Sequence, residues 1–171
     1  MIHLHPAEMS RRKPKKKIRV IYQSAGPLPQ RIAHLYAGQL LVFTDASHQR
    51  HGGLAAVLFS SPEAEPIIET RTVPALGSST LELHAVLFGL LQAEIHCPES
   101  PLTVFSDNLD AVNALKQAKT NGVQNLDALP AEFSLSIIEM VLSRAEFRWV
   151  KGHSYCRGNT LADLHAGNAA C

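Results

Sequence analysis

The chain has 171 residues, of which 46% are hydrophobic and 18% charged, and a net charge of +1 at pH 7. This composition is ordinary for a single soluble globular domain with a sizeable core. No apolar run approaches the ~18–20 residues of a membrane span, and the basic N-terminus leads into no apolar block of the kind found in secretory signals. Three scattered cysteines predict reduced thiols, so we expect a cytoplasmic protein without a membrane segment.

The charge is divided unevenly along the chain. Residues 1–19 contain seven basic residues and one acidic residue, whereas residues 20–171 contain nine basic and fourteen acidic residues. A basic arm on an acidic body favours a polyanionic partner, but a solvated tail or residues added for expression would look the same. Four prolines and few periodic apolar positions predict that residues 1–37 form a flexible arm, with a short helix at residues 30–36. Residues 38–171 form the predicted domain.

The first predicted elements of the domain are three strands and a helix. Residues 40–44 are an apolar, β-branched run that ends at Asp45, and residues 52–60 follow closely enough to be its hairpin partner. Residues 65–74 alternate in polarity, which predicts a more exposed third strand. Residues 78–95 carry an apolar stripe with helical spacing and a capping serine or threonine at position 79 or 80, so they predict a long helix.

The second half of the chain alternates strands and helices. Strands are expected at residues 102–107 and 146–150, and helices at residues 108–118, 126–145 and 160–170. In the strand at residues 146–150, Phe147 and Trp149 are interpreted as core or sheet residues rather than as platforms for stacking bases. The resulting order is β-β-β-α-β-α-α-β-α. It predicts an α/β fold with a five-stranded mixed sheet and helices on its faces.

Four acidic residues lie where strands are predicted to end or helices to begin. Asp45 and Asp107 end the first and fourth strands, and Glu82 and Asp163 are placed in the first turns of helices. Sites in open α/β sheets assemble at such positions. Neighbouring carboxylates repel each other unless a divalent cation lies between them, and an all-oxygen ligand set favours Mg²⁺ or Mn²⁺ over zinc.

Each acidic residue also has a purely structural interpretation. Asp45 could open a turn, and Glu82 could complete a capping box with Ser79. Asp107 could cap the helix that follows it, and Asp163 could complete a capping box with Thr160. Spacing alone leaves both interpretations open.

Longer motifs around these residues are more specific. The stretches VFTDAS, SSTLELHAVLFGLL, LTVFSDNLDAV and WVKGHSYCRGNTLADLHA occur in this order and in the expected structural context. Together they resemble ribonuclease H of type 1, a family that includes the ribonuclease H domains of reverse transcriptases. The resemblance runs from about residue 39 to residue 170, and its most specific piece is the K-G-H loop followed by G-N-x-x-A-D.

The resemblance implies a ribonuclease H-like fold and hydrolysis of the RNA strand of RNA–DNA hybrids, with 5′-phosphate and 3′-hydroxyl products. It implies two Mg²⁺ ions, with Mn²⁺ as an alternative, on either side of the scissile phosphate. Asp45 would bridge both ions, Glu82 and Asp107 would complete one site, and Asp163 the other. His153, on the K-G-H loop, would assist proton transfer and product departure.

The resemblance also implies residues that contact the substrate. The backbone amides of Gly52 and Gly53 would help to sense 2′-hydroxyl groups, and Ser78 and Ser79 replace asparagines that are common in the family. Asn159 could fix the K-G-H loop or touch a phosphate, or it could be a helix N-cap.

A basic protrusion that some relatives use to hold the hybrid is missing from the short segment 119–127. The N-terminal arm could replace it through six basic residues, which are Arg11, Arg12, Lys13, Lys15, Lys16 and Lys17. We expect a monomer. Two alternatives to a free-standing enzyme are the ribonuclease H domain of a retroelement or viral polyprotein and a non-catalytic hybrid-binding protein on the same fold.

Overall fold

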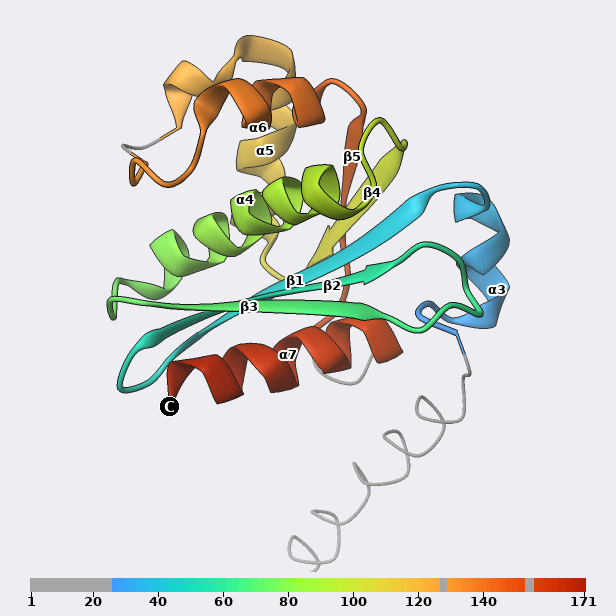
Figure 1. The fold of residues 1–171 in the computed structure, drawn as a ribbon, viewed down its shortest axis with the longest axis horizontal. Coiled ribbons are helices and arrows are strands. Elements are labelled where there is room, and N and C mark those ends of the chain that lie inside the picture. The colour runs from blue at the N-terminus through green and yellow to red at the C-terminus, as the bar shows by residue number, and fades with distance from the viewer. Residues whose placement is uncertain (1–25, 127–128, 153–155) are drawn as a thin grey trace, which may run out of the picture.

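The computed structural model describes residues 26–126, 129–152 and 156–171. Its centre is a five-stranded sheet in the order β3-β2-β1-β4-β5 (Figure 1). β1 (Leu40–His48), β2 (Gly52–Phe59) and β3 (Ile67–Val73) form an antiparallel meander, whereas β4 (Leu102–Ser106) and β5 (Ala145–Trp149) continue the sheet in parallel. The predicted mixed sheet and the predicted order of elements are therefore confirmed.

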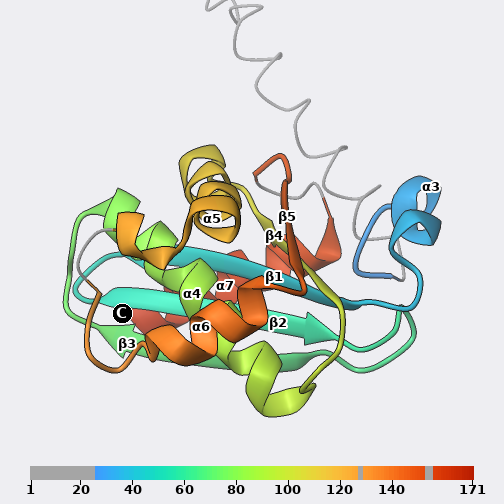
Figure 2. The ribbon, with the colours of Figure 1, turned by 90° about the horizontal axis from the view of Figure 1, so that it is seen from above.

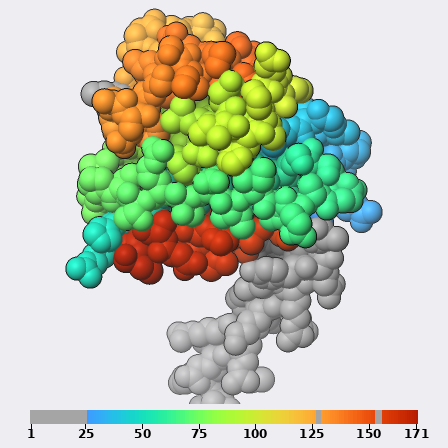
Figure 3. All heavy atoms as spheres, viewed as in Figure 1, coloured from blue at the N-terminus to red at the C-terminus, as the bar shows by residue number. Residues whose placement is uncertain are grey.

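Helices cover both faces of this sheet. α4 (Ser78–His96), α5 (Leu109–Asn121) and α6 (Leu135–Leu142) lie on one face, and α7 (Arg157–Ala170) lies on the other (Figures 1 and 2). Figure 3 shows the edge strand β3 and α4 between α6 on one side and α7 on the other. Because strand side chains alternate between faces, Val42 joins the core under α4 and Phe43 joins the core under α7.

The described part of the N-terminal segment packs against the second of these cores. α3 (Gln30–Ala33) and the 3-10 helix η1 (His34–Tyr36) occupy the positions of the expected short helix. Leu28 is 1% exposed, and Ile32 and Tyr36 contact the same core. Residues 26–37 are thus part of the packed body, although they were assigned to the arm. Residues 1–25, with all six candidate basic residues, lie outside the described ranges.

The predicted helix over residues 126–145 is wrong in its extent. Among the described residues of this segment, 126 and 129–145, the α-helical part is α6, Leu135–Leu142, and the short 3-10 helix η2 (Val123–Asn125) precedes it. Pro130 interrupts the segment: a proline lacks the backbone N–H and disfavours helical geometry in the residue before it. Its carbonyl instead accepts a turn hydrogen bond from Phe133 N at 3.0 Å.

Two further boundaries differ from expectation. β1 continues to His48, so Asp45 lies within the strand, paired with Ala55, rather than at its end. α7 begins at Arg157, three residues before the expected start. Among the described helices, none combines the length and the apolar character needed to cross a membrane.

Candidate active site

Three carboxylates meet where β4 ends beside the middle of β1. One oxygen each of Asp45, Glu82 and Asp107 lies within 4.8 Å of the other two. The parallel pairing of β1 with β4 places Phe43 opposite Phe105, so each aspartate lies two residues beyond the same rung of the sheet. Three residues that are remote in the sequence therefore form one cluster.

Glu82 reaches the cluster because α4 lies very close to β1. Gly89 makes this approach possible: a Cβ at this position would lie 2.5 Å from Thr44 Cγ2 and 3.2 Å from Val42 Cγ1. Any larger residue would push the helix away from the strand. The glutamate is the fifth residue of α4, in its second turn rather than in its first.

The electrostatics of the cluster are unfavourable for three negative charges. Burial, followed by the charges of Glu82 and Asp107, raises the pKa of Asp45 to about 9. Burial, followed by the charge of Asp107, raises the pKa of Glu82 to about 7. Glu82 Oε2 is buried and has no hydrogen-bond partner among the described residues. A hard divalent cation would relieve both the repulsion and the missing partner, so the residues present fit Mg²⁺ or Mn²⁺.

The fourth acidic residue lies next to this cluster but is not part of it. Asp163 is the seventh residue of α7, in its second turn, and it is exposed. Its charge nevertheless contributes to the raised pKa values of Asp45 and Glu82. The structure therefore brings three of the predicted ligands together and places the fourth within electrostatic reach of them.

The capping interpretations of these residues are wrong. α4 begins after Gly77 without a side-chain cap, and the cap position of α7 is Cys156. At α5 the cap is Asn108, whose Oδ1 accepts a hydrogen bond from Ala111 N at 2.9 Å. The carboxylates of Glu82, Asp107 and Asp163 are thus not used to cap helices.

The two candidate glycines have a clear packing role. Gly52 and Gly53 lie in β2 between β1 and β3, paired with both neighbouring strands. A Cβ on Gly53 would lie 2.1 Å from the carbonyl oxygen of Ala166 in α7. The absence of a side chain at Gly53 therefore allows α7 to lie on the sheet, whereas a Cβ on Gly52 would lie 2.7 Å from Leu81 of α4. The predicted contact of the glycine amides with substrate stays a prediction.

A small cavity next to Glu82 adds two residues that sequence reasoning missed. Its volume is about 60 Å³, and its lining includes Ser47, His48, Ser78 and Glu82. Ser78 is exposed at the start of α4, as is Ser79. No local signal distinguishes His48 in the sequence, because its place beside Glu82 depends on the contact between β1 and α4.

One remaining candidate lies at the start of α7. Asn159 is fully buried as the third residue of this helix, so the N-cap interpretation is wrong. Its Oδ1 and Nδ2 atoms have no hydrogen-bond partner in the described part of the chain. His153 lies outside the described residues, and its role in proton transfer stays a prediction.

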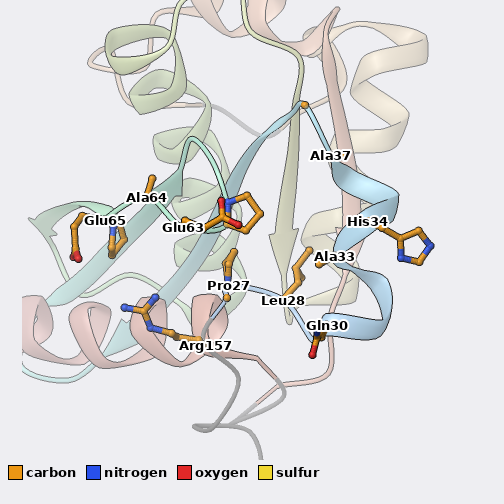
Figure 4. Close-up of a pocket in the computed structure, with 14 residues that line it drawn as sticks. Pro27, Leu28, Gln30, Ala33, His34, Ala37, Glu63, Ala64, Glu65 and Arg157 are labelled. Atoms are coloured by element: carbon orange, nitrogen blue, oxygen red, sulfur yellow. The ribbon is translucent and has the colours of Figure 1, made fainter.

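A second cavity lies away from the carboxylates. It has a volume of about 940 Å³ and is formed by residues 26–38, the loop after β2 and Arg157 of α7 (Figure 4). None of the four predicted metal ligands lines it. The candidate active site is therefore the carboxylate cluster and not this cavity.

Comparisons with known proteins place the chain in a family and a fold. The family model described as RNase H matches residues 37–171. The native protease-reverse transcriptase of prototype foamy virus is similar in structure, with a TM-score of 0.59 and 20% identity over 79% of this chain. Its CSH mutant matches with a TM-score of 0.58 and 20% identity over 77% of this chain. The match spans 21% and 20% of those two chains, about a fifth of their length. The comparison with curated proteins gave no match.

Proposed function

The chain belongs to the ribonuclease H family, and from this premise we propose that its carboxylate cluster hydrolyses the RNA strand of RNA–DNA hybrids. The observation that carries the proposal is the convergence of Asp45, Glu82 and Asp107 within 4.8 Å. Burial and mutual repulsion raise the pKa of Asp45 and of Glu82. A protein that only bound the hybrid would gain nothing from this arrangement next to a phosphate backbone.

In this proposal two Mg²⁺ ions, with Mn²⁺ as an alternative, would be held by four acidic residues, which are Asp45, Glu82, Asp107 and Asp163. Bound there, the ions would supply an activated water and stabilise the leaving oxygen. Asp45 is the most deeply buried of the four acids and would contribute to both ions, whereas the exposed Asp163 would complete the ligand set from α7. Water adds across the phosphorus–3′-oxygen bond, which leaves a 5′-phosphate and a 3′-hydroxyl end. His153 assists the proton transfers.

Recognition of the hybrid would begin beside Glu82. Ser78 and His48 present polar side chains around the small cavity there, and both are exposed. Serine and histidine can donate and accept hydrogen bonds, as contact with a 2′-hydroxyl requires. The basic residues of the arm would hold the phosphate backbone, so deleting residues 1–19 should weaken hybrid binding and flatten its salt dependence. An unchanged slope would remove the arm from the binding surface.

A cleavage assay tests the proposal directly. The substrates are an RNA–DNA hybrid, double-stranded RNA, double-stranded DNA and single-stranded RNA, each with Mg²⁺ and with Mn²⁺. The wild-type protein should cut only the RNA strand of the hybrid, and Asp107→Asn should be inert. Asp110→Asn is the matched control, because Asp110 is exposed in the first turn of α5 and lies outside the carboxylate cluster. Full activity of Asp107→Asn would refute the assignment of the site.

A further inference from the structure

Trp149 is the only tryptophan of the chain, and its indole reaches the backbone of a candidate metal ligand. Nε1 of Trp149 donates a hydrogen bond to the carbonyl oxygen of Asp107 at 3.0 Å. We propose that this bond makes Trp149 a positioning residue, which holds Asp107 in the orientation that binding of a divalent cation requires. The inference rests on the function proposed above for the carboxylate cluster.

The bond continues the sheet beyond the end of β4. Ser106, the last residue of β4, pairs with Trp149, and its carbonyl accepts a hydrogen bond from Val150 N at 3.0 Å. At Asp107 the strand has ended, and the Trp149 indole N–H takes the place of a backbone donor. The carbonyls of Ser106 and Asp107 are therefore both held by residues at the end of β5.

The residue after Asp107 is held as well. Asn108 N donates to Ser106 Oγ at 3.1 Å, and the Asn108 side chain caps α5. Asp107 thus lies between two fixed neighbours, and its own carbonyl is held by Trp149. Rotation of this peptide would move the carboxylate, because the side chain and the carbonyl share one Cα.

The chain also returns to Asp107 on its carboxylate side. A Cβ on Gly152 would lie 3.0 Å from Asp107 Oδ2, a separation that leaves little room for a side chain. Trp149 and Gly152 are three residues apart, so the end of β5 and the residues after it confine Asp107 at both its carbonyl and its carboxylate. Groups that orient metal ligands in this way affect metal affinity without touching the metal.

Burial does not account for a tryptophan at this position. Trp149 is 50% exposed, whereas Phe147, two residues earlier in β5, is 1% exposed and belongs to the core. A half-exposed aromatic residue on an edge strand gains less from packing than a buried one. The hydrogen bond is the contribution of Trp149 that phenylalanine would lack.

The experiment replaces the indole N–H alone. Because the chain has one tryptophan, growth of a tryptophan auxotroph on 3-benzothienylalanine changes only this position and substitutes sulfur for the N–H. The matched control is 5-fluorotryptophan, which keeps the N–H and provides a fluorine signal next to the site. Binding of Mn²⁺ and Mg²⁺ is measured without nucleic acid by calorimetry, and kcat and KM are measured on the hybrid.

We expect the benzothienyl protein to bind metal about three- to tenfold more weakly, since one main-chain hydrogen bond is lost rather than a ligand. At subsaturating Mg²⁺ its kcat should fall by a similar factor with KM for the hybrid unchanged, and the fluorotryptophan protein should resemble wild type. Trp149→Phe is a second variant that also lacks the N–H, in case the benzothienyl protein does not fold.

Equal metal affinity and equal kcat in wild type and in either variant would overturn the inference. So would a loss of thermal stability in Trp149→Phe with metal affinity unchanged, since the bond would then be structural only. Metal binding that depends on the indole N–H, without any cleavage of the hybrid, would support the inference while refuting the proposed function.

Discussion

Replacing Asp45 by asparagine should stabilise the metal-free protein increasingly as the pH rises. Asp45 is 4% exposed, and burial together with the nearby carboxylates raises its pKa from 3.8 to about 9. Between these pH values the folded protein keeps a proton that the unfolded chain releases. The free energy of unfolding then decreases with rising pH, by about 1.4 kcal/mol per pH unit for one carboxyl group. From pH 5 to pH 7 the loss is about 3 kcal/mol, and asparagine does not undergo it.

Urea and thermal unfolding at pH 5, 6 and 7 in the presence of a chelator measure this effect. The stability of Asp45→Asn relative to wild type should increase by about 3 kcal/mol over this range, or by roughly 6–12 °C in the unfolding midpoint of a chain of this size. Comparing the two proteins cancels the titrating groups that do not interact with Asp45, including the buried His84. Saturating Mg²⁺ should stabilise wild type at pH 7 and leave the variant nearly unchanged.

Asp110→Asn is the control for the loss of one negative charge, because Asp110 is exposed in the first turn of α5. Its stability relative to wild type should stay constant from pH 5 to pH 7. If the difference in stability between Asp45→Asn and wild type is also constant from pH 5 to pH 7, the pKa of Asp45 is not raised. The conclusion that burial and repulsion create a cation site would then be refuted.

Three other substitutions test the fold and the site. Gly53→Ala should lower the free energy of unfolding, measured in urea, by about 1–3 kcal/mol, because the new Cβ meets the α7 backbone. The control is Gly167→Ala, whose Cβ would lie 3.7 Å from Gln49 Nε2 and which should leave the free energy of unfolding unchanged. Burial lowers the pKa of His84, so on acidification below about pH 6.5 the unfolded chain takes up a proton before the folded protein does, and wild type loses stability. His84→Gln should not show this loss. Identical stability profiles of the variant and wild type in acid would contradict this prediction. Asp163→Asn should reduce hybrid cleavage more at low Mg²⁺ than at high Mg²⁺, and equal loss at both concentrations would exclude Asp163 as a metal ligand.

Local sequence patterns were enough to predict most of the elements. The apolar run before Asp45, the alternating residues of β3 and the apolar stripe of α4 each depend on neighbours in the chain, and the structure has elements at all three places. Where two local signals compete, as in residues 126–145, the apolar periodicity was misleading. Pro130 and the turn after it restrict the helix to α6.

The candidate site was only partly accessible from the sequence. The motifs around Asp45, Glu82 and Asp107 predicted which residues belong to it, but each acid had an equally good local use as a turn or cap residue. The tertiary structure decided between these uses, because the pairing of β1 with β4 and the contact of α4 with β1 bring the carboxylates together. The bond from Trp149 to Asp107 likewise requires the pairing of β4 with β5. Periodicity along the chain determines helices and strands, whereas the distances between remote side chains follow from strand register and packing.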